Sequence, residues 1–163
     1  MPKLLGEFEC KLDAKGRLRV PSQLVRQFEM FGYKEFVLNR GLESCLDFYP
    51  QEEWDNISEE VDSLSDYVKK HRDYKRWFYR GASKMVLDGN DRILIPLRLQ
   101  DYGLLKKDVI LIAMKNKIEI WAKEVYDADL PIDPDAYTKL AEEVMGDRLR
   151  RGMPNTDSPQ GPR

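Results

Sequence analysis

A cluster of basic side chains near the N-terminus is the most concentrated source of chemistry in this sequence. Its members are Lys11, Lys15, Arg17 and Arg19. Asp13 is the one acidic residue in the segment 11–19, so these nine residues carry a net charge of +3. A guanidinium presents its N–H groups in a planar fork, which suits a phosphate or the edge of a guanine. The cluster is therefore a candidate contact for nucleic acid.

A weaker form of the same cluster follows 75 residues later. Residues 13–17 read DAKGR and residues 88–92 read DGNDR, so an aspartate and an arginine recur four positions apart. Asn90 and Arg92 are the candidate contacts in the second copy. Leu94 stands where the first copy has its last arginine. We therefore expect the two copies to contribute unequally.

A structural explanation of these motifs competes with the functional one. Charged hairpin tips are commonly just solvated, and Asp13 could pair with Arg17 only to fix the shape of the turn. The recurrence of the pattern at Asp88 and Arg92 favours a function, because a solvated tip has no need of a fixed arginine. A basic hairpin that occurs twice also suits a surface that follows the phosphates of a duplex.

Other kinds of site find little support in the sequence. His71 is the only histidine and is expected on an apolar helix face, which disfavours a metal-binding or catalytic role. Cys10 and Cys45 fall in strand patterns and are interpreted as core thiols, too few for a zinc cluster. Asp13 and Asp88 could imitate a paired-carboxylate acid–base site, but neither is followed by the Thr/Ser-Gly that such a site needs. No glycine-rich phosphate loop occurs, and we expect neither an enzyme nor a bound cofactor or metal.

Alternating apolar and polar residues define the strands that would carry the basic tip. Phe8, Cys10 and Leu12 alternate with charged residues, which is the period-two pattern of a half-buried strand. A turn at 13–16 and a second strand at 17–20 would complete a hairpin. The other expected elements are a helix from Pro21 and strands at 35–39 and 45–49 in the first copy, and strands at 85–87, 92–95, 108–114 and 117–121 with a helical turn from Pro96 in the second.

The repeat divides the chain into five segments. They are a first repeat at 7–54, a helical linker at 55–82, a second repeat at 83–126, a C-terminal helix at 127–146 and a disordered tail at 147–163. Ser65 is the expected N-cap of a second linker helix, whose apolar face would include Tyr67, Val68, Tyr74 and Trp77. Neither repeat is expected to stand alone, so the two should pack as one pseudo-twofold unit.

Composition indicates a folded chain with local rather than global basic character. Of 163 residues, 42% are hydrophobic and 34% are charged, and the net charge is −2. The repeats sum to +1 over residues 1–50 and +2 over 82–126, whereas the linker (51–81) and the tail (127–163) sum to −2 and −3. The longest apolar run, Val109–Met114, falls far short of the ~20 residues that span a bilayer. A cytoplasmic protein without a membrane partner is therefore expected.

The tandem motifs carry a family resemblance. Asp13–Arg17 and Asp88–Arg92, each followed by an apolar-x-apolar-Pro run, resemble the paired motif of the MraZ proteins. The segments LDFYPQEEW (Leu46–Trp54) and IEIW (Ile118–Trp121) are also similar to that family's pattern. The resemblance covers about residues 6–126, and two motifs in order, with both trailing segments, make it specific.

The resemblance implies a fold and a function. The fold would be α+β and mainly β, an AbrB-like swapped-hairpin barrel built from two tandem SpoVT-AbrB-like repeats with helices outside. The function would be that of a bacterial DNA-binding transcriptional regulator, acting on the promoter of its own division and cell-wall gene cluster. Closed ring oligomers, often octameric, and association with the nucleoid are implied as well. The family motif maps its basic loop positions onto Lys15, Arg17, Asn90 and Arg92, whereas Asp91 departs from it.

Ring assembly would reconcile DNA binding with a net charge of −2. Several basic hairpins on one rim would bind double-stranded DNA through multivalency, and repeated promoter boxes would have to match neighbouring protomers. Such binding should weaken steeply with salt. The alternative is an oligomeric protein-interaction scaffold, in which the acidic linker and tail bind protein partners and DNA affinity is incidental.

Overall fold

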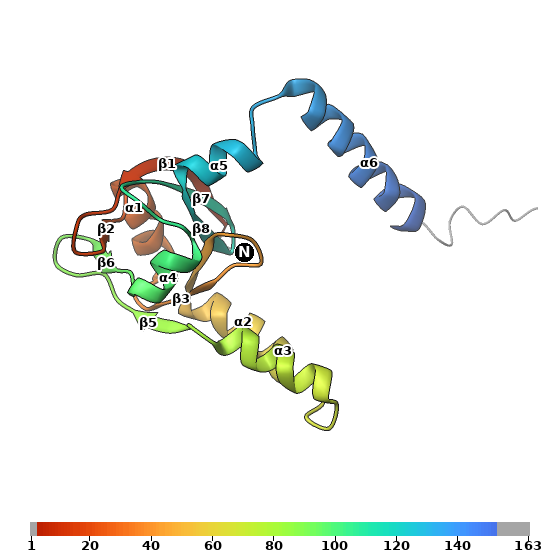
Figure 1. Ribbon diagram of the computed structural model, residues 1–163, viewed down its shortest axis with the longest axis horizontal. Helices are drawn as coiled ribbons and strands as arrows, with labels where there is room; N and C mark the ends of the chain where they lie inside the picture. The colour runs from red at the N-terminus through yellow and green to blue at the C-terminus, as the bar shows by residue number, and fades with distance from the viewer. Residues whose placement is uncertain (1–2, 153–163) are drawn as a thin grey trace, which may run out of the picture. The chain divides into compact units, whose positions relative to one another are not determined.

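The computed structural model describes residues 3–152, and the chain divides into two compact units whose boundary falls between Tyr126 and Asp127. The first unit contains β1 (Leu4–Lys11), β2 (Arg17–Arg19), α1 (Ser22–Phe31), β3 (Phe36–Arg40), β4 (Leu46–Pro50), α2 (Gln51–Asp62), α3 (Lys69–Tyr79), β5 (Ser83–Met85), β6 (Arg92–Leu94), α4 (Leu97–Tyr102), β7 (Asp108–Lys115) and β8 (Lys117–Ala122) (Figure 1). The short helix α5 (Lys123–Asp129) crosses the boundary, and α6 (Pro134–Gly152) belongs to the second unit.

The described strands pair in antiparallel fashion and form two sheets. Six strands make one sheet in the order β1-β7-β8-β4-β3-β5, and β2 pairs with β6 in a separate two-stranded ribbon. Exchanging repeat-equivalent strands (β1 with β5, β7 with β3, β8 with β4) returns the same order in reverse. The sheet therefore has the pseudo-twofold arrangement that the repeats predict, and the α+β, mainly antiparallel fold is confirmed.

The local hairpin expected at residues 7–20 does not form as a continuous ladder. β1 and β2 share a single isolated bridge, from Leu12 to Leu18, and beyond it each strand pairs with the other repeat. Four of the six strand pairs among residues 3–152 join one repeat to the other. This exchange is the swapped arrangement that the family resemblance implies. Residue alternation could not reveal it, because a strand shows the same period against any partner.

One hydrophobic core gathers side chains from the large sheet, the ribbon, α1 and α4. Leu18 and Ile93 form the central pair of the ribbon, and their side chains point into the core and are 0% and 2% exposed. Phe36 stacks on Phe48 with ring centroids 4.8 Å apart, and Phe28 of α1 lies 4.7 Å from the same Phe36 ring. Because both repeats supply residues to this core, it forms only when they come together.

A proline starts the helix that follows each ribbon strand. Pro21 and Pro96 are the N-cap residues of α1 and α4, and both have a φ of −56°. Proline fixes φ near this value and lacks the N–H that a helix start leaves unpaired. The two helices then bury Leu24 and Leu99 against the core. The prolines thus hold the outgoing ends of the ribbon at equivalent positions.

The linker forms a helical hairpin, α2 and α3, as its sequence predicts (Figure 1). Trp54 of α2 stacks on Phe78 of α3 with ring centroids 5.1 Å apart. The connecting turn is tied down by Lys75, whose ammonium donates to Leu64 O at 2.5 Å and pairs with Asp66 at 2.8 Å. Aromatic stacking and this lysine therefore fix the two helices together.

The start of α3 differs from the sequence prediction. The helix begins at Lys69, and Ser65 does not cap it. The Ser65 hydroxyl instead accepts the N–H of Tyr67 within the turn, at 3.1 Å, which is a common use of serine in turns. All four residues expected on the apolar face of this helix are exposed: Tyr67, Val68, Tyr74 and Trp77. Helical spacing of apolar residues therefore did not predict which side of α3 is buried.

The helix α6 begins at Pro134 rather than at residue 127, where the expected C-terminal helix begins. The Asp133 carboxylate accepts the N–H groups of Asp135 and Ala136 at 3.1 and 3.4 Å, and Pro134 occupies the first helical position. An aspartate cap followed by proline is a favoured way to begin a helix. None of the helices within residues 3–152 combines the length and the apolar composition needed to cross a membrane.

The C-terminal end of α6 lies beyond the predicted one. The helix continues through Gly146 to Gly152, so both the expected end at Gly146 and the expected disorder of residues 147–152 are wrong. A glycine inside a helix costs only about 1 kcal/mol relative to alanine, and an ion pair between Asp147 and Arg150 supports the added turns. The rest of the expected disordered tail, residues 153–163, lies outside the described residues.

Candidate nucleic-acid interface

The two-stranded ribbon brings basic residues of both repeats to one surface. Its register pairs Arg17 with Leu94, Leu18 with Ile93 and Arg19 with Arg92. Because successive residues of a strand point to opposite faces, the central pair faces the core and the four flanking side chains face outward. The outer face therefore carries three arginines and a leucine that is 61% exposed.

Asp13 organises the first ribbon tip, residues 13–17, around its carboxylate. Oδ1 accepts the backbone N–H of Lys15 at 2.9 Å and that of Arg17 at 2.8 Å, and Oδ2 accepts the Arg17 Nε–H at 3.0 Å. The backbone closes the same turn, because the Gly16 N–H donates to Asp13 O at 3.0 Å. One aspartate therefore fixes both the turn and the orientation of the arginine.

The second tip, residues 88–92, repeats this geometry. Asp88 Oδ1 accepts the N–H of Asn90 at 2.8 Å and that of Arg92 at 2.9 Å, and Oδ2 accepts the Arg92 Nε–H at 3.0 Å. The Asp91 N–H donates to Asp88 O at 3.0 Å, as its counterpart does in the first tip. Two tips of different sequence thus present their arginines in the same way.

The aspartate–arginine pairs are structural, as the competing interpretation holds, but they do not occupy the arginines fully. Asp13 and Asp88 accept a hydrogen bond from Nε, and within residues 3–152 neither Nη1 nor Nη2 of Arg17 or Arg92 donates one. The two arginine side chains are 34% and 26% exposed. Each guanidinium is therefore held in place with its terminal nitrogens available to an incoming acceptor.

Each tip requires one residue with a left-handed backbone. Gly16 has a φ of +82° and Asp91, at the equivalent position, has a φ of +59°. Aspartate enters this region more readily than most residues because its short polar side chain can bond locally. Asp91, which departs from the family motif, thus meets a backbone requirement. The same positions link the repeats, because Asp91 O accepts the Val20 N–H and Gly16 O accepts the Ile95 N–H, both at 2.8 Å.

Substitutions at these two equivalent positions should differ in outcome. The Cβ of Gly16→Ala would lie 2.5 Å from Gln100 Nε2 and 3.3 Å from Ile95 O, on left-handed backbone. We expect this variant to lose about 1–3 kcal/mol of unfolding free energy. Asp91→Gly keeps an allowed conformation and should change stability by less than about 0.5 kcal/mol. Urea denaturation measures the unfolding free energy of both variants. Equal stability of the two would contradict the left-handed backbone and the close contact described at Gly16.

Gln100 supports the first tip without any signal in the repeat pattern. Its Nε2 donates to Ile95 O at 2.8 Å and occupies the space that a Cβ on Gly16 would need. The equivalent residue of the first repeat, at an offset of 75, is Val25, which has no polar group to offer. Comparison of the two repeats therefore gave no reason to single out this glutamine.

The remaining candidate contacts fall into two groups. Lys15 and Asn90 lie exposed at the two tips, and the tip aspartates hold their backbone N–H groups. Lys11 lies at the end of β1, and its ammonium pairs with Asp108 of β7. A phosphate would have to compete with this carboxylate. The structure thus brings Lys15, Asn90 and the three arginines together at the ribbon, and leaves Lys11 in the large sheet.

The two tips differ in charge although they share a geometry. Residues 13–17 sum to +1, from one acidic and two basic side chains, and residues 88–92 sum to −1, from two acidic and one basic. An approaching phosphate is therefore attracted more strongly to the first tip than to the second.

The tip aspartates should make this surface sensitive to acid. The backbone hydrogen bond from Arg17 holds the pKa of Asp13 below its usual range, and the equivalent bond from Arg92 lowers the pKa of Asp88. A carboxylate with a lower pKa in the folded state stabilises the fold above its unfolded pKa of about 3.9. That stabilisation is lost as the pH falls through the lower, folded pKa.

We therefore expect the backbone amide resonances of Arg17 and Arg92 to titrate with midpoints below about pH 3.9 in an NMR pH series. Asp13→Asn should remove the titration at Arg17 and leave that at Arg92 unchanged. A midpoint at or above the ordinary aspartate pKa would show that the carboxylates are not held as described.

A family model and individual relatives both match this chain along most of its length. A family model described as "MraZ protein, putative antitoxin-like" matches residues 4–77 and again residues 78–130. A protein named transcriptional regulator MraZ from Christiangramia forsetii is 40% identical over 147 residues, which is 90% of this chain and 95% of that protein. Proteins of the same name from Flavobacterium psychrophilum and Cytophaga hutchinsonii are 37% and 35% identical over 90% and 86% of this chain, and 94% and 93% of their own lengths.

These relatives are named as regulators rather than as enzymes. The two matches to the family model follow one another in the same order as the two repeats of the structure. Since the matches together cover most of the chain and the relatives align along nearly their whole length, this chain belongs to the MraZ family.

Proposed function

We propose that this chain is a sequence-specific DNA-binding transcriptional regulator that acts on the promoter of its own division and cell-wall gene cluster. The observation that carries the proposal is the pair of outward-facing arginines, Arg17 and Arg92, each held at Nε by its own aspartate. The names of the relatives support the same conclusion.

The ribbon has the size and the donors for reading base edges. A two-stranded ribbon fits the major groove, which is about 12 Å wide and displays a distinct donor and acceptor pattern for each base pair. Arginine reads guanine by donating two N–H groups to O6 and N7. Because Asp13 engages Nε, Arg17 retains its Nη groups for such a contact. Arg19 and Lys15 would then bind phosphates and fix the register on the duplex.

Assembly into a ring would supply the affinity that one protomer lacks. A chain with a net charge of −2 gains little from general attraction to DNA. Several ribbons on one rim act together, because each bound ribbon raises the effective concentration of the next. The promoter would then carry boxes repeated at the spacing of neighbouring protomers. Binding of this kind places the protein on the nucleoid, within the cytoplasm.

The test is fluorescence anisotropy of a duplex from immediately upstream of this gene, compared with a scrambled duplex of the same composition across a salt titration. We expect the native duplex to bind at least about 10³-fold more tightly, with an affinity that falls steeply as salt rises. Equal binding to both duplexes at physiological salt would overturn sequence-specific recognition. Absence of binding to either duplex would overturn DNA binding altogether.

A second function, that of a protein-interaction scaffold, is favoured by the exposed face of α6. Tyr137, Leu140 and Val144 recur at helical spacing and are 76%, 59% and 55% exposed. An exposed apolar face of this kind suits a protein partner. Under this function, deleting residues 134–163 should abolish partner capture, whereas Arg17→Ala should leave it unchanged. The same two variants have the opposite ranking in the DNA-binding assay if the regulator proposal holds.

A further inference from the structure

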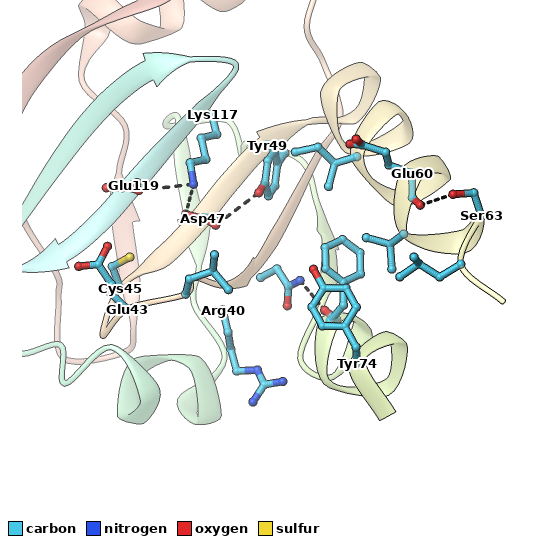
Figure 2. A pocket seen from close by; sticks show the side chains of 16 residues that line it. Arg40, Glu43, Cys45, Asp47, Tyr49, Glu60, Ser63, Tyr74, Lys117 and Glu119 are labelled. Atoms are coloured by element: carbon cyan, nitrogen blue, oxygen red, sulfur yellow. Dashed lines mark hydrogen bonds and ion pairs between the residues drawn. The ribbon is translucent and has the colours of Figure 1, made fainter. Parts of the chain in front are cut away.

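A cavity of about 690 Å³ lies away from the ribbon, and side chains of β3, β4 and β8 on one side and of α2 and α3 on the other line it (Figure 2). The strand register places three of its polar residues in one row, because Asn39 pairs with Asp47 and Asp47 pairs with Glu119. Paired residues of adjacent strands project from the same face of a sheet. The cavity wall is therefore built around a row of polar groups, of which Asn39 and Asp47 are buried.

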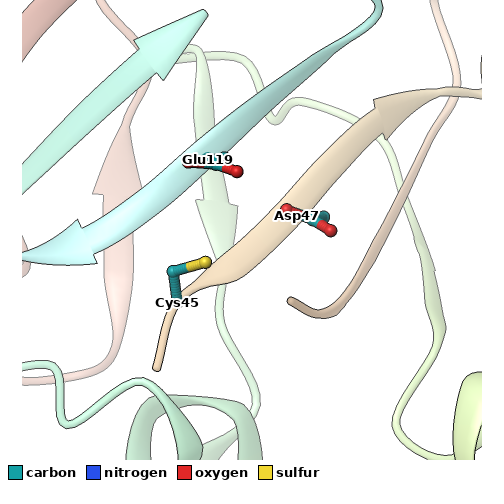
Figure 3. A group of neighbouring side chains, drawn as sticks. All are labelled: Cys45, Asp47 and Glu119. Atoms are coloured by element: carbon teal, nitrogen blue, oxygen red, sulfur yellow. The ribbon is translucent and has the colours of Figure 1, made fainter. Parts of the chain in front are cut away.

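Asp47 and Glu119 of this row form a cluster with Cys45. One ligand atom from each, the Sγ and two carboxylate oxygens, lies within 4.8 Å of the other two (Figure 3). Asp47 and Glu119 occupy equivalent positions in the two repeats, so the pseudo-twofold symmetry brings two acids face to face. Asp47 is only 6% exposed, and its burial raises the pKa of the carboxyl group.

Lys117 supplies the positive charge that this cluster needs. Its ammonium lies 3.2 Å from Asp47 Oδ1 and 3.4 Å from Glu119 Oε2 (Figure 2). Among the described residues, Asp47 Oδ1 has no hydrogen-bond donor besides this ammonium. The lysine side chain is 25% exposed, so it has a path out of the cluster toward solvent. The cation position is thus filled by a group that can leave.

Two further observations indicate that the cluster is built for a ligand. Asn39 is 3% exposed, and its Nδ2 donates to Phe78 O at 2.7 Å, which fixes the amide and leaves Oδ1 without a partner among residues 3–152. Gly41 keeps space open beside the donor atoms, because a Cβ there would lie 2.6 Å from Cys45 Sγ and 3.4 Å from Asp47 Oδ1. An unpartnered buried oxygen and an open cradle thus lie beside the cluster.

We propose that Cys45, Asp47 and Glu119 bind a thiophilic divalent cation, Zn²⁺ in the first instance, and that Lys117 is the resident cation which the metal displaces. One thiolate and two carboxylates are ligands that Zn²⁺ accepts in a four-coordinate site, and water completes the set. The site joins β4 of the first repeat to β8 of the second, so a bound metal would crosslink the two repeats.

The binding step balances in charge and in protons. The buried Cys45 thiol loses its proton to solvent as the Zn–S bond forms, and the Lys117 ammonium moves into water with its charge unchanged. Ligand atoms of a tetrahedral Zn²⁺ are about 3.5 Å apart, given bonds of about 2.0–2.3 Å. The three donor atoms lie within 4.8 Å of one another, so the most distant pair must move about 1 Å closer together. A bound cation favours this movement, because it removes the repulsion between the two carboxylates.

The test uses the full-length chain after metal has been removed with a chelator. Co²⁺ is the probe, because a thiolate bound to it gives a charge-transfer absorption band, and Zn²⁺ then competes the Co²⁺ away. We expect the band in the unaltered protein and in the control Cys10→Ser, whose thiol lies in β1. Cys45→Ser should lose it. Persistence of the band in Cys45→Ser, or its absence from the unaltered protein at saturating Co²⁺, would overturn the proposal.

Lys117→Met separates a metal site from a simple buried ion pair. If the lysine fills the cation position about nine-tenths of the time, its removal should tighten Zn²⁺ binding about tenfold. The metal-free variant should melt at a lower temperature, because the buried Asp47 and the partly buried Glu119 lose their partner, and Zn²⁺ should restore its Tm. A variant that is destabilised but neither binds Zn²⁺ more tightly nor regains stability with it would show that the cluster is an ion pair alone.

Discussion

Under the proposed function, replacing Arg17 by alanine should abolish specific DNA binding while the fold persists. A bidentate arginine–guanine contact contributes about 1–3 kcal/mol of discrimination, which corresponds to about 5–150-fold in affinity. In an assembly the loss recurs at every ribbon that touches DNA, so the factors multiply. We therefore expect the affinity for the native duplex to fall by at least about 100-fold, toward that for the scrambled duplex.

The fold should survive this substitution because Arg17 lies on the outer face of the ribbon. Its side chain pairs with Asp13, and an exposed ion pair contributes only about 0–1 kcal/mol. The neighbouring Leu18, which anchors the ribbon in the core, is unchanged. Anisotropy measures the loss of binding, and sedimentation and thermal unfolding test whether the variant keeps the size and the stability of the unaltered protein.

Two variants control for charge and for position. Arg76→Ala removes an equal charge from α3, where the side chain is 68% exposed, and should leave DNA binding nearly unchanged. Arg92→Ala removes the equivalent arginine of the second tip, whose net charge is −1, and should cause a smaller loss than Arg17→Ala. If Arg76→Ala weakens binding as much as Arg17→Ala, the ribbon is not the reading surface.

Truncating Phe36 to alanine should cause the largest loss of stability in the first unit. Its side chain is 1% exposed and packs against two other rings, at 4.8 Å from Phe48 and 4.7 Å from Phe28. Removing a buried phenylalanine side chain costs about 3–5 kcal/mol, from lost burial and from the cavity left behind. Because both repeats share this core, the loss destabilises the pair rather than one repeat.

Urea denaturation followed by circular dichroism measures this loss as a lower midpoint with an unchanged slope. Met30→Ala is the control, because Met30 lies on α1 with 75% of its surface exposed and should change stability by less than about 0.5 kcal/mol. A Phe36→Ala protein within 1 kcal/mol of the unaltered chain, roughly the effect of an average substitution, would mean that these rings do not carry the core.

The sequence predicts the repeats and their strands, but not which strands pair. Leu18 and Ile93 have the alternation of half-buried strands, and both are buried as expected. That alternation is the same whether β2 pairs with its neighbour β1 or with β6 of the other repeat. Partner choice is decided by a core that both repeats must complete, which is a tertiary property. The family resemblance, rather than the residue pattern, supplied it.

The candidate interface was predictable at the level of residue type, and its geometry was not. Both arginines and both aspartates were visible as a recurring motif, and the structure places all four at the ribbon and its tips. The backbone requirement at Asp91 was hidden, because glycine is the usual signal for a left-handed residue.

The buried polar row shows the limit of sequence analysis more plainly. Asn39, Asp47 and Glu119 are 8 and 72 residues apart along the chain and belong to three strands. Only the register of those strands makes them neighbours. In the sequence each of these polar residues stands alone within an apolar strand, and nothing there shows that the three meet in one cluster.

Four of the six described strand pairs run between the repeats, so the peptide connection through the α2–α3 turn is not what keeps them together. Tyr67, which is 96% exposed in that turn, marks a place where a protease can cut without reaching the core. A chain nicked there should migrate as one species on a native gel and as two on a denaturing gel. A gene split at the same point would encode two subunits, each unable to fold alone and each completing the other as an obligate heterodimer.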